Sequence, residues 1–176
     1  IIEGGFQATF ELVNRGELTI KRSPYSSENI IDFNSTSSVI NVGKLNIEGN
    51  LRLNALFSNL SEVNVDGNLW LNSNRGYCLA NGSIMNVGGS SNINSPILGN
   101  GGCLHSVGEV SLEQNYVQNS GNRVTPENQL VYICSEHGFS GGFQYNANAP
   151  ENRSGGAVLQ DNCTGCSGGG GGGGGG

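Results

Sequence analysis

A short motif built around one glycine recurs along this 176-residue chain, and it restricts the possible folds more than any other feature. Each copy places alternating apolar and polar residues beside the glycine, as in Val63-Asn64-Val65-Asp66-Gly67-Asn68-Leu69-Trp70-Leu71. The glycines that mark the copies lie 27, 24, 21 and 20 residues apart and are Gly16, Gly43, Gly67, Gly88 and Gly108. A further half-copy, Glu48-Gly49-Asn50-Leu51-Arg52-Leu53, lies inside the second repeat.

Alternation with a period of two predicts strands that bury one face, and the glycines predict corners between them. A repeat of this length matches one coil of a solenoid and is too short for a propeller blade. We therefore predict an all-β fold, a right-handed parallel β-helix of about five coils. Its inner columns are expected to run through Leu18, Leu45, Leu69 and Val110. An antiparallel β-sandwich is the alternative, because the Asp-Gly-Asn and Glu-Gly-Asn segments also suit hairpin turns.

The flanks of the repeat region differ from it in composition. Residues 1–38 are interpreted as an N-terminal cap with the first coil, and residues 39–127 as the solenoid coils. Residues 128–167 contain several aromatic side chains and are interpreted as a C-terminal cap that closes the core. Residues 168–176 are all glycine, which cannot bury apolar surface, so this tail is predicted to be a linker.

The five cysteines predict disulfides in an exported protein. Cys78 and Cys103 occupy similar phases on adjacent coils, and the spacing of coils suits a disulfide, so we predict that they are bonded. Cys134 is expected to pair with Cys163 or Cys166, and a bond between Cys163 and Cys166 is the alternative. A redox or zinc site at Cys163-x-x-Cys166 is disfavoured because a glycine run, not a helix, follows it.

The sequence offers little for catalysis. None of the three aspartates, Asp32, Asp66 and Asp161, belongs to a close acidic pair of the kind that glycoside hydrolases use. Glu48 and Asp66 precede equivalent glycines and are expected to stack on adjacent coils, a pattern that favours solvation or a calcium ion over acid–base chemistry. The two histidines are expected to be turn or edge residues. We therefore predict no catalytic residue, no cofactor and no resident metal.

Charge and hydropathy limit the classes of partner that the chain can bind. Eight Lys and Arg residues and a net charge of -6 leave no basic face for a nucleic acid. No apolar run approaches the ~20 residues that a membrane-spanning helix needs. Trp70 alternates with Leu69 and Leu71, so it is expected to point outward, where it is a candidate for stacking on a sugar ring.

The repeat at Val63–Leu71 resembles those of bacterial surface β-helix proteins, including filamentous-haemagglutinin-type adhesins. The segment Asn162–Gly168 resembles the tails of large exported Bacteroidota proteins, the cargo of type IX secretion. The repeat resemblance covers residues 13–112 and transfers no catalytic residue. It implies a secreted or cell-surface protein with a structural, adhesive or filament-forming role. Because solenoid ends expose strand edges, we expect self-association or contact with neighbouring domains of a longer chain. A carbohydrate-binding or carbohydrate-processing β-helix is the alternative.

Overall fold

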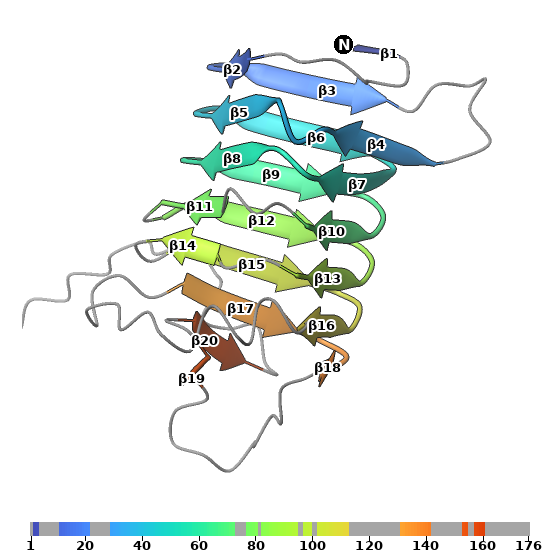
Figure 1. Cartoon of the computed structure of the whole chain (residues 1–176), viewed down its shortest axis with the longest axis vertical. Helices are drawn as coiled ribbons and strands as arrows, with labels where there is room; N and C mark the ends of the chain where they lie inside the picture. The colour runs from blue at the N-terminus through green and yellow to red at the C-terminus, as the bar shows by residue number, and fades with distance from the viewer. Residues whose placement is uncertain are drawn as a thin grey trace, which may run out of the picture.

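The computed structural model is built from short strands joined by tight corners (Figure 1). The residues that it describes are 2–3, 11–21, 29–72, 77–80, 82–94, 97–99, 102–112, 131–141, 153–154 and 157–160. Within those ranges all regular structure is β, and no helix with the length and apolar character needed to cross a membrane is found. Cys163, Cys166 and the glycine tail 168–176 lie outside the described residues.

The strands form three sheets, here called A, B and C. Sheet A contains, in spatial order, β1 (Ile2–Glu3), β3 (Glu17–Lys21), β6 (Lys44–Glu48), β9 (Glu62–Val65), β12 (Ile84–Val87), β15 (Cys103–Ser106), β17 (Val131–Ser135), β20 (Ala157–Gln160) and β19 (Arg153–Ser154). Sheet B contains β2 (Glu11–Asn14), β5 (Ser38–Asn41), β8 (Leu56–Asn59), β11 (Tyr77–Leu79) and β14 (Ile97–Gly99). Sheet C contains β4 (Ile30–Phe33), β7 (Asn50–Leu53), β10 (Leu69–Leu71), β13 (Ser91–Ile93), β16 (Val110–Leu112) and β18 (Phe139–Gly141).

The chain passes from sheet B to sheet A to sheet C and then starts again, so each circuit adds one coil to a stack (Figure 1). Five such three-strand coils run from β2 to β16, and β17 and β18 extend sheets A and C. Neighbouring strands are parallel, except that β19 pairs antiparallel with β20. The structure confirms the prediction of a parallel β-helix of about five coils rather than an antiparallel sandwich.

The core consists of columns of inward-facing side chains, and their register differs from the predicted one. In sheet A, Leu18 pairs with Leu45, and Leu45 pairs with Val63. Leu69 and Val110 belong to a different column, in sheet C. The expectation of one column through Leu18, Leu45, Leu69 and Val110 was therefore wrong.

The error arose because similar glycine motifs mark two different corners. Gly16 and Gly43 stack at the corner from sheet B to sheet A, where the Lys44 amide donates to the Gly16 carbonyl at 2.8 Å. Gly67 lies instead at the corner from sheet A to sheet C, and its amide donates to the Gly49 carbonyl at 2.9 Å. The half-copy around Gly49 is thus the true counterpart of the motif around Gly67. A Cβ on Gly43 would lie 2.0 Å from the Gly16 carbonyl oxygen, so this close stacking requires glycine.

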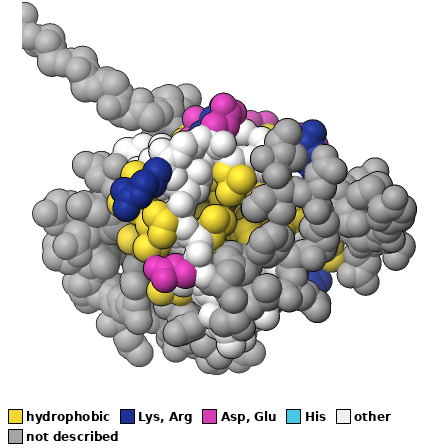
Figure 2. All heavy atoms as spheres, turned by 90° about the horizontal axis from the view of Figure 1, so that it is seen from above, with side chains coloured by type: hydrophobic (Ala, Val, Ile, Leu, Met, Phe, Trp, Pro, Cys, Tyr) yellow, Lys and Arg dark blue, Asp and Glu magenta, His cyan; other side chains and the backbone are white. Residues whose placement is uncertain are grey.

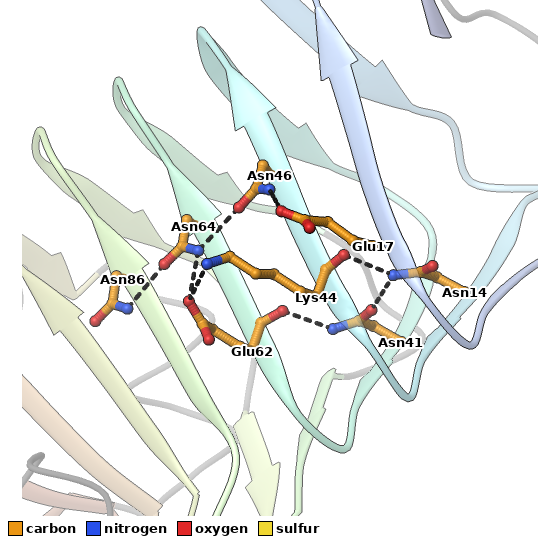
Figure 3. Close-up of polar contacts among 8 residues, drawn as sticks. All are labelled: Asn14, Glu17, Asn41, Lys44, Asn46, Glu62, Asn64 and Asn86. Carbon is orange, nitrogen blue, oxygen red and sulfur yellow. Dashed lines mark hydrogen bonds and ion pairs between the residues drawn. The ribbon is translucent and has the colours of Figure 1, made fainter. Parts of the chain in front are cut away.

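A buried ladder of asparagines lines the corner from sheet B to sheet A. Asn14 Nδ2 donates to Asn41 Oδ1 at 2.8 Å (Figure 3). Asn41 Nδ2 in turn donates to Asn59 Oδ1 at 2.9 Å. Each amide also donates to a main-chain carbonyl of the following coil: Asn14 to Lys44, Asn41 to Glu62, and Asn59 to Ile84. Because these buried amides have partners, they add directional links between coils to the apolar packing.

The buried columns predict a sharp difference between adjacent positions of one strand. Leu69→Lys should abolish folding, because Leu69 is fully buried and an unpaired ammonium in an apolar core costs several kcal/mol of a total stability of ~5–15 kcal/mol. Trp70→Lys, one residue along and facing outward, should leave the fold intact. Far-ultraviolet circular dichroism and thermal unfolding distinguish the two, and a folded Leu69→Lys chain would contradict the core assignment.

The asparagine ladder predicts a similar contrast. Asn41→Ala should lower the free energy of unfolding by about 2–4 kcal/mol, because it removes the buried partner of one Asn14 N–H and the side-chain donor to the Glu62 carbonyl. Asn46→Ala, on the outward face of β6, should cost about 1 kcal/mol or less. Urea unfolding measures both, and equal losses would contradict a special role for the inner ladder.

Candidate functional site

Trp70 lies on the outward face of sheet C, as the alternation predicts, between the buried Leu69 and Leu71. In the strand register it follows Asp32 and Arg52 in one row across the sheet. The Arg52 guanidinium carbon lies 6.0 Å from the centre of the Trp70 ring, within reach of a cation–π contact. Arg52 also pairs with Asp32 at 3.4 Å. The row thus presents an aromatic ring that is already in contact with a cation of the same chain.

Sheet A carries a second ladder of amides on its outward face (Figure 3). Asn64 Nδ2 donates to Asn46 Oδ1 at 3.0 Å, and Asn86 Nδ2 donates to Asn64 Oδ1 at 2.9 Å. At the N-terminal end, Asn46 Nδ2 donates to Glu17 Oε1 at 3.2 Å. At the other end, Asn86 Oδ1 accepts no hydrogen bond from the described residues. The ladder therefore offers one acceptor toward the coils that follow.

The outer ladder includes a carboxylate with two partners. Glu62 Oε1 accepts from Asn64 at 2.7 Å and forms an ion pair with Lys44 at 3.3 Å. The hydrogen bond from Asn64 lowers the pKa of Glu62 below its ordinary value of 4.5; desolvation acts in the opposite direction, and Lys44 lowers it further. Glu62 is thus a charged structural group of the sheet surface rather than a proton donor.

An open groove of about 560 Å³ lies beside this ladder, at the corner from sheet A to sheet C. Its lining consists of Asn64, Val65, Asp66, Asn86, Val87, Gly88, His105 and Val107. The groove contains amide, carboxylate and imidazole groups and no Lys or Arg among its lining residues. Such a surface suits a neutral ligand with many hydroxyl groups better than an anion.

The two histidines make contacts between neighbouring coils. His105 Nε2 lies 2.8 Å from Glu136 Oε1, and His137 Nδ1 lies 2.5 Å from the Val107 carbonyl oxygen. Both contacts join the fifth coil to the turn between β17 and β18. His105 thereby lines the groove with its ring held by a carboxylate.

Glu48 and Asp66 stack in equivalent positions, as predicted, since the Asp66 amide donates to the Ile47 carbonyl at 3.0 Å. Glu48, however, forms an ion pair with Lys21 at 3.0 Å. Among the described residues, no group of three or more His, Cys, Asp or Glu side chains is arranged to hold a metal ion.

The cysteines are arranged differently from the prediction. Cys78 is an exposed free thiol on sheet B, whereas Cys103 and Cys134 on sheet A are disulfide-bonded. The predicted bond between Cys78 and Cys103 is therefore wrong. In the strand register Cys78 lies between Ser58 and Leu98 on sheet B, whereas Cys103 begins β15 on sheet A, one coil further along. The bond from Cys134 to Cys163 or Cys166 stays a prediction, because the last two lie outside the described residues.

Comparison of the chain with protein-family models, curated proteins and solved structures gave no match. The fold defines the chain as a parallel β-solenoid.

The lowered pKa of Glu62 predicts a pH-dependent contribution to stability. Because the pKa is lower in the folded state, Glu62 stabilises the fold above its unfolded pKa, and this contribution is lost as the pH falls through the folded pKa. The melting temperatures of the parent chain and of Glu62→Gln should therefore differ most near neutral pH and converge in acid. Thermal unfolding between about pH 7 and about pH 3 provides the measurement. A difference that stays constant over this range would contradict the assignment.

Proposed function

We propose that this chain is a non-catalytic extracellular β-solenoid that serves as a structural or adhesive building block of a surface or filament. The observation that carries the proposal is the state of the core at the N-terminal end. Leu12 and Leu18 begin two core columns and are only half-buried, whereas the next members, Val39 and Leu45, are fully buried. Figure 2 looks down on this end and has hydrophobic side chains at its surface.

The main chain at the same end supports strand addition. β1 pairs with β3 only at Ile20 and Lys21. Among the described strands, Glu17–Thr19 and the whole of β2 have a neighbour on one side only. An added strand would find both hydrogen-bonding groups and half-exposed leucines there.

The opposite end differs in sheet A. β20 covers β17, and the antiparallel β19 follows β20. Ile133, the member of the Leu18 column on β17, is fully buried, and Leu159 on β20 follows it in the register. The two ends of the rod are thus unlike, which suits head-to-tail addition of subunits.

An extracellular location is supported by the bonding state of the cysteines. Cys103 and Cys134 are disulfide-bonded, and disulfides persist mainly in oxidising compartments.

Carbohydrate binding is the second candidate, favoured by the polar groove beside the outer ladder. Trp70 does not belong to that groove, because it lies on sheet C and the groove opens on the sheet A side of the corner. A sugar hydroxyl there would donate to the Asp66 carboxylate or to the Asn86 carbonyl oxygen, both of which line the groove.

The proposed contact at the N-terminal end of the rod, here called the end contact, is tested by placing a charge at the half-buried Leu18. The parent chain should form assemblies that grow with concentration in sedimentation velocity, and Leu18→Lys should remove them while leaving the fold intact. Val107→Lys, an exposed position far from that end, is the matched control. A parent chain that stays monomeric at high concentration and binds a neutral oligosaccharide would overturn the proposal in favour of the second candidate.

A further inference from the structure

The outward face of sheet A changes from polar to apolar along the stack. One row of outward positions, which the strand register brings side by side, consists of Lys44, Glu62, Ile84, Cys103 and Tyr132. The first two residues of this row form an ion pair, whereas the last three are apolar. Cys103 and Cys134 form a small buried cluster outside the inner core, and the half-buried Ile84 and Tyr132 pack against it. We refer to these four residues as the outer apolar cluster.

Both cysteines of the cluster are more deeply buried than the outward residue beside them. Cys103 is 6% exposed and Cys134 is 0% exposed. The side chain of His105, which is the register partner of Cys134 on the same face, is 25% exposed. An outward side chain has no other sheet above it, so burial to this degree requires that a further segment covers it.

The bonding state of the cysteines limits which segment this is. Cys103 and Cys134 are each disulfide-bonded, and Cys78 is a free thiol. Cys103 and Cys134 lie on neighbouring strands but are offset by two residues, since Cys103 pairs with Tyr132. At ~4.8 Å between strands and ~3.3 Å per residue, this offset separates their Cα atoms by about 8 Å. Disulfides need a Cα separation below about 7 Å, so the two are not bonded to each other.

The remaining cysteines of the sequence are Cys163 and Cys166, so elimination makes them the partners of Cys103 and Cys134. The path of the chain allows this. β20 ends at Gln160, which pairs with Cys134 in the register, and Cys163 follows three residues later. The two intervening residues are Asp and Asn, which favour turns, so the chain can reverse onto the outward face.

The spacing within Cys163-x-x-Cys166 fits the spacing between the two cysteines of sheet A. Three residues of extended chain span up to about 10 Å, which is enough for the ~8 Å from Cys134 to Cys103. Cys134 lies beside the end of β20, and Cys103 lies one strand further away. The shortest path therefore takes Cys163 to Cys134 and Cys166 to Cys103.

We propose that segment 161–167 docks on the outer apolar cluster and is fixed there by two disulfides, Cys134–Cys163 and Cys103–Cys166. The docked segment closes this part of sheet A to other molecules. It also ties together β15, β17 and β20, which lie side by side in the sheet (Figure 1). The proposal does not depend on the structural or adhesive role proposed above.

The chemistry is oxidation by disulfide exchange. Each bond forms from two thiols, which lose two protons and two electrons as the S–S bond is made. Each bond consumes one equivalent of a disulfide oxidant, such as oxidised glutathione or a protein disulfide carrier, which is reduced to two thiols. The segment is therefore fixed only in a compartment that supplies such an oxidant.

Peptide mapping of the full oxidised chain tests the connectivity directly. Free thiols are first blocked with iodoacetamide, and the chain is then unfolded and digested with trypsin at mildly acidic pH without reductant. Cleavage after Arg75, Arg123 and Arg153 gives the peptides 76–123, 124–153 and 154–176. We expect one species in which all three peptides are linked, with the blocking group on Cys78. Peptides 76–123 and 124–153 linked to each other, with 154–176 separate, would overturn the proposal.

Thiol counts in cysteine variants give an independent test. In the unfolded, unreduced state, Ellman's reagent should detect about one thiol in the parent chain and about three in Cys163→Ser/Cys166→Ser, because Cys103 and Cys134 are too far apart to bond to each other. Cys78→Ser is the matched control and should give no signal. A double variant that keeps a single thiol would reveal a bond between Cys103 and Cys134 and overturn the docking.

If the double variant loses its native circular dichroism spectrum, Cys166→Ser takes its place. This variant keeps the bond from Cys163 to Cys134 and should release one further thiol, at Cys103. Maleimide labelling and mass spectrometry locate that thiol. Labelling at Cys134 instead overturns the assigned order of the two bonds.

Discussion

Main-chain pairing between successive coils is the interaction on which the rest of the structure depends. No coil can bury its own apolar face, so each is stable only on its neighbours. Parallel pairing in register brings like positions of successive coils together, which converts one coil's sequence pattern into columns and ladders. The close stacking of Gly43 on Gly16 shows how tightly the corners must fit for this register to hold. The hydrogen bonds between the buried asparagines of successive coils are directional, so they help to fix the same register.

The three outward faces then differ in chemistry although they share one backbone geometry. Sheet A carries amides and ion pairs, sheet C carries the Arg52–Trp70 contact, and exposed valine and leucine side chains lie on sheet B and its corner toward sheet A. Such a division suits a building block, because separate faces can meet solvent, ligand and neighbouring copies. The half-buried leucines at the N-terminal end add a fourth surface, which runs across the rod axis.

Alternation and corner glycines were enough to predict the parallel coils from the sequence, and the outward direction of Trp70 followed from Leu69 and Leu71. These signals did not determine the register, because Asn-x-Gly marks two different corners, as in Asn41-Val42-Gly43 and Asn86-Val87-Gly88. In addition, the turn of the coil from Leu45 to Val63 is shorter than the glycine spacing suggests. The cysteine error followed from the register error, since a disulfide depends on which sheet each residue joins. The outer ladder had a visible signal in the asparagines at 46, 64 and 86, whereas the exposure of Leu60 had none, because Leu60 resembles a core residue until the corner is placed.

Residue-resolved amide hydrogen exchange tests the central claim, that stability comes from stacking on both sides of each coil. The amides of β6, β9 and β12 should be the most protected, and protection should fall toward β2 and Glu17–Thr19, which have one described neighbour. Rapid exchange at Leu45 and Val63, or equal protection from the first coil to the fourth, would contradict the account.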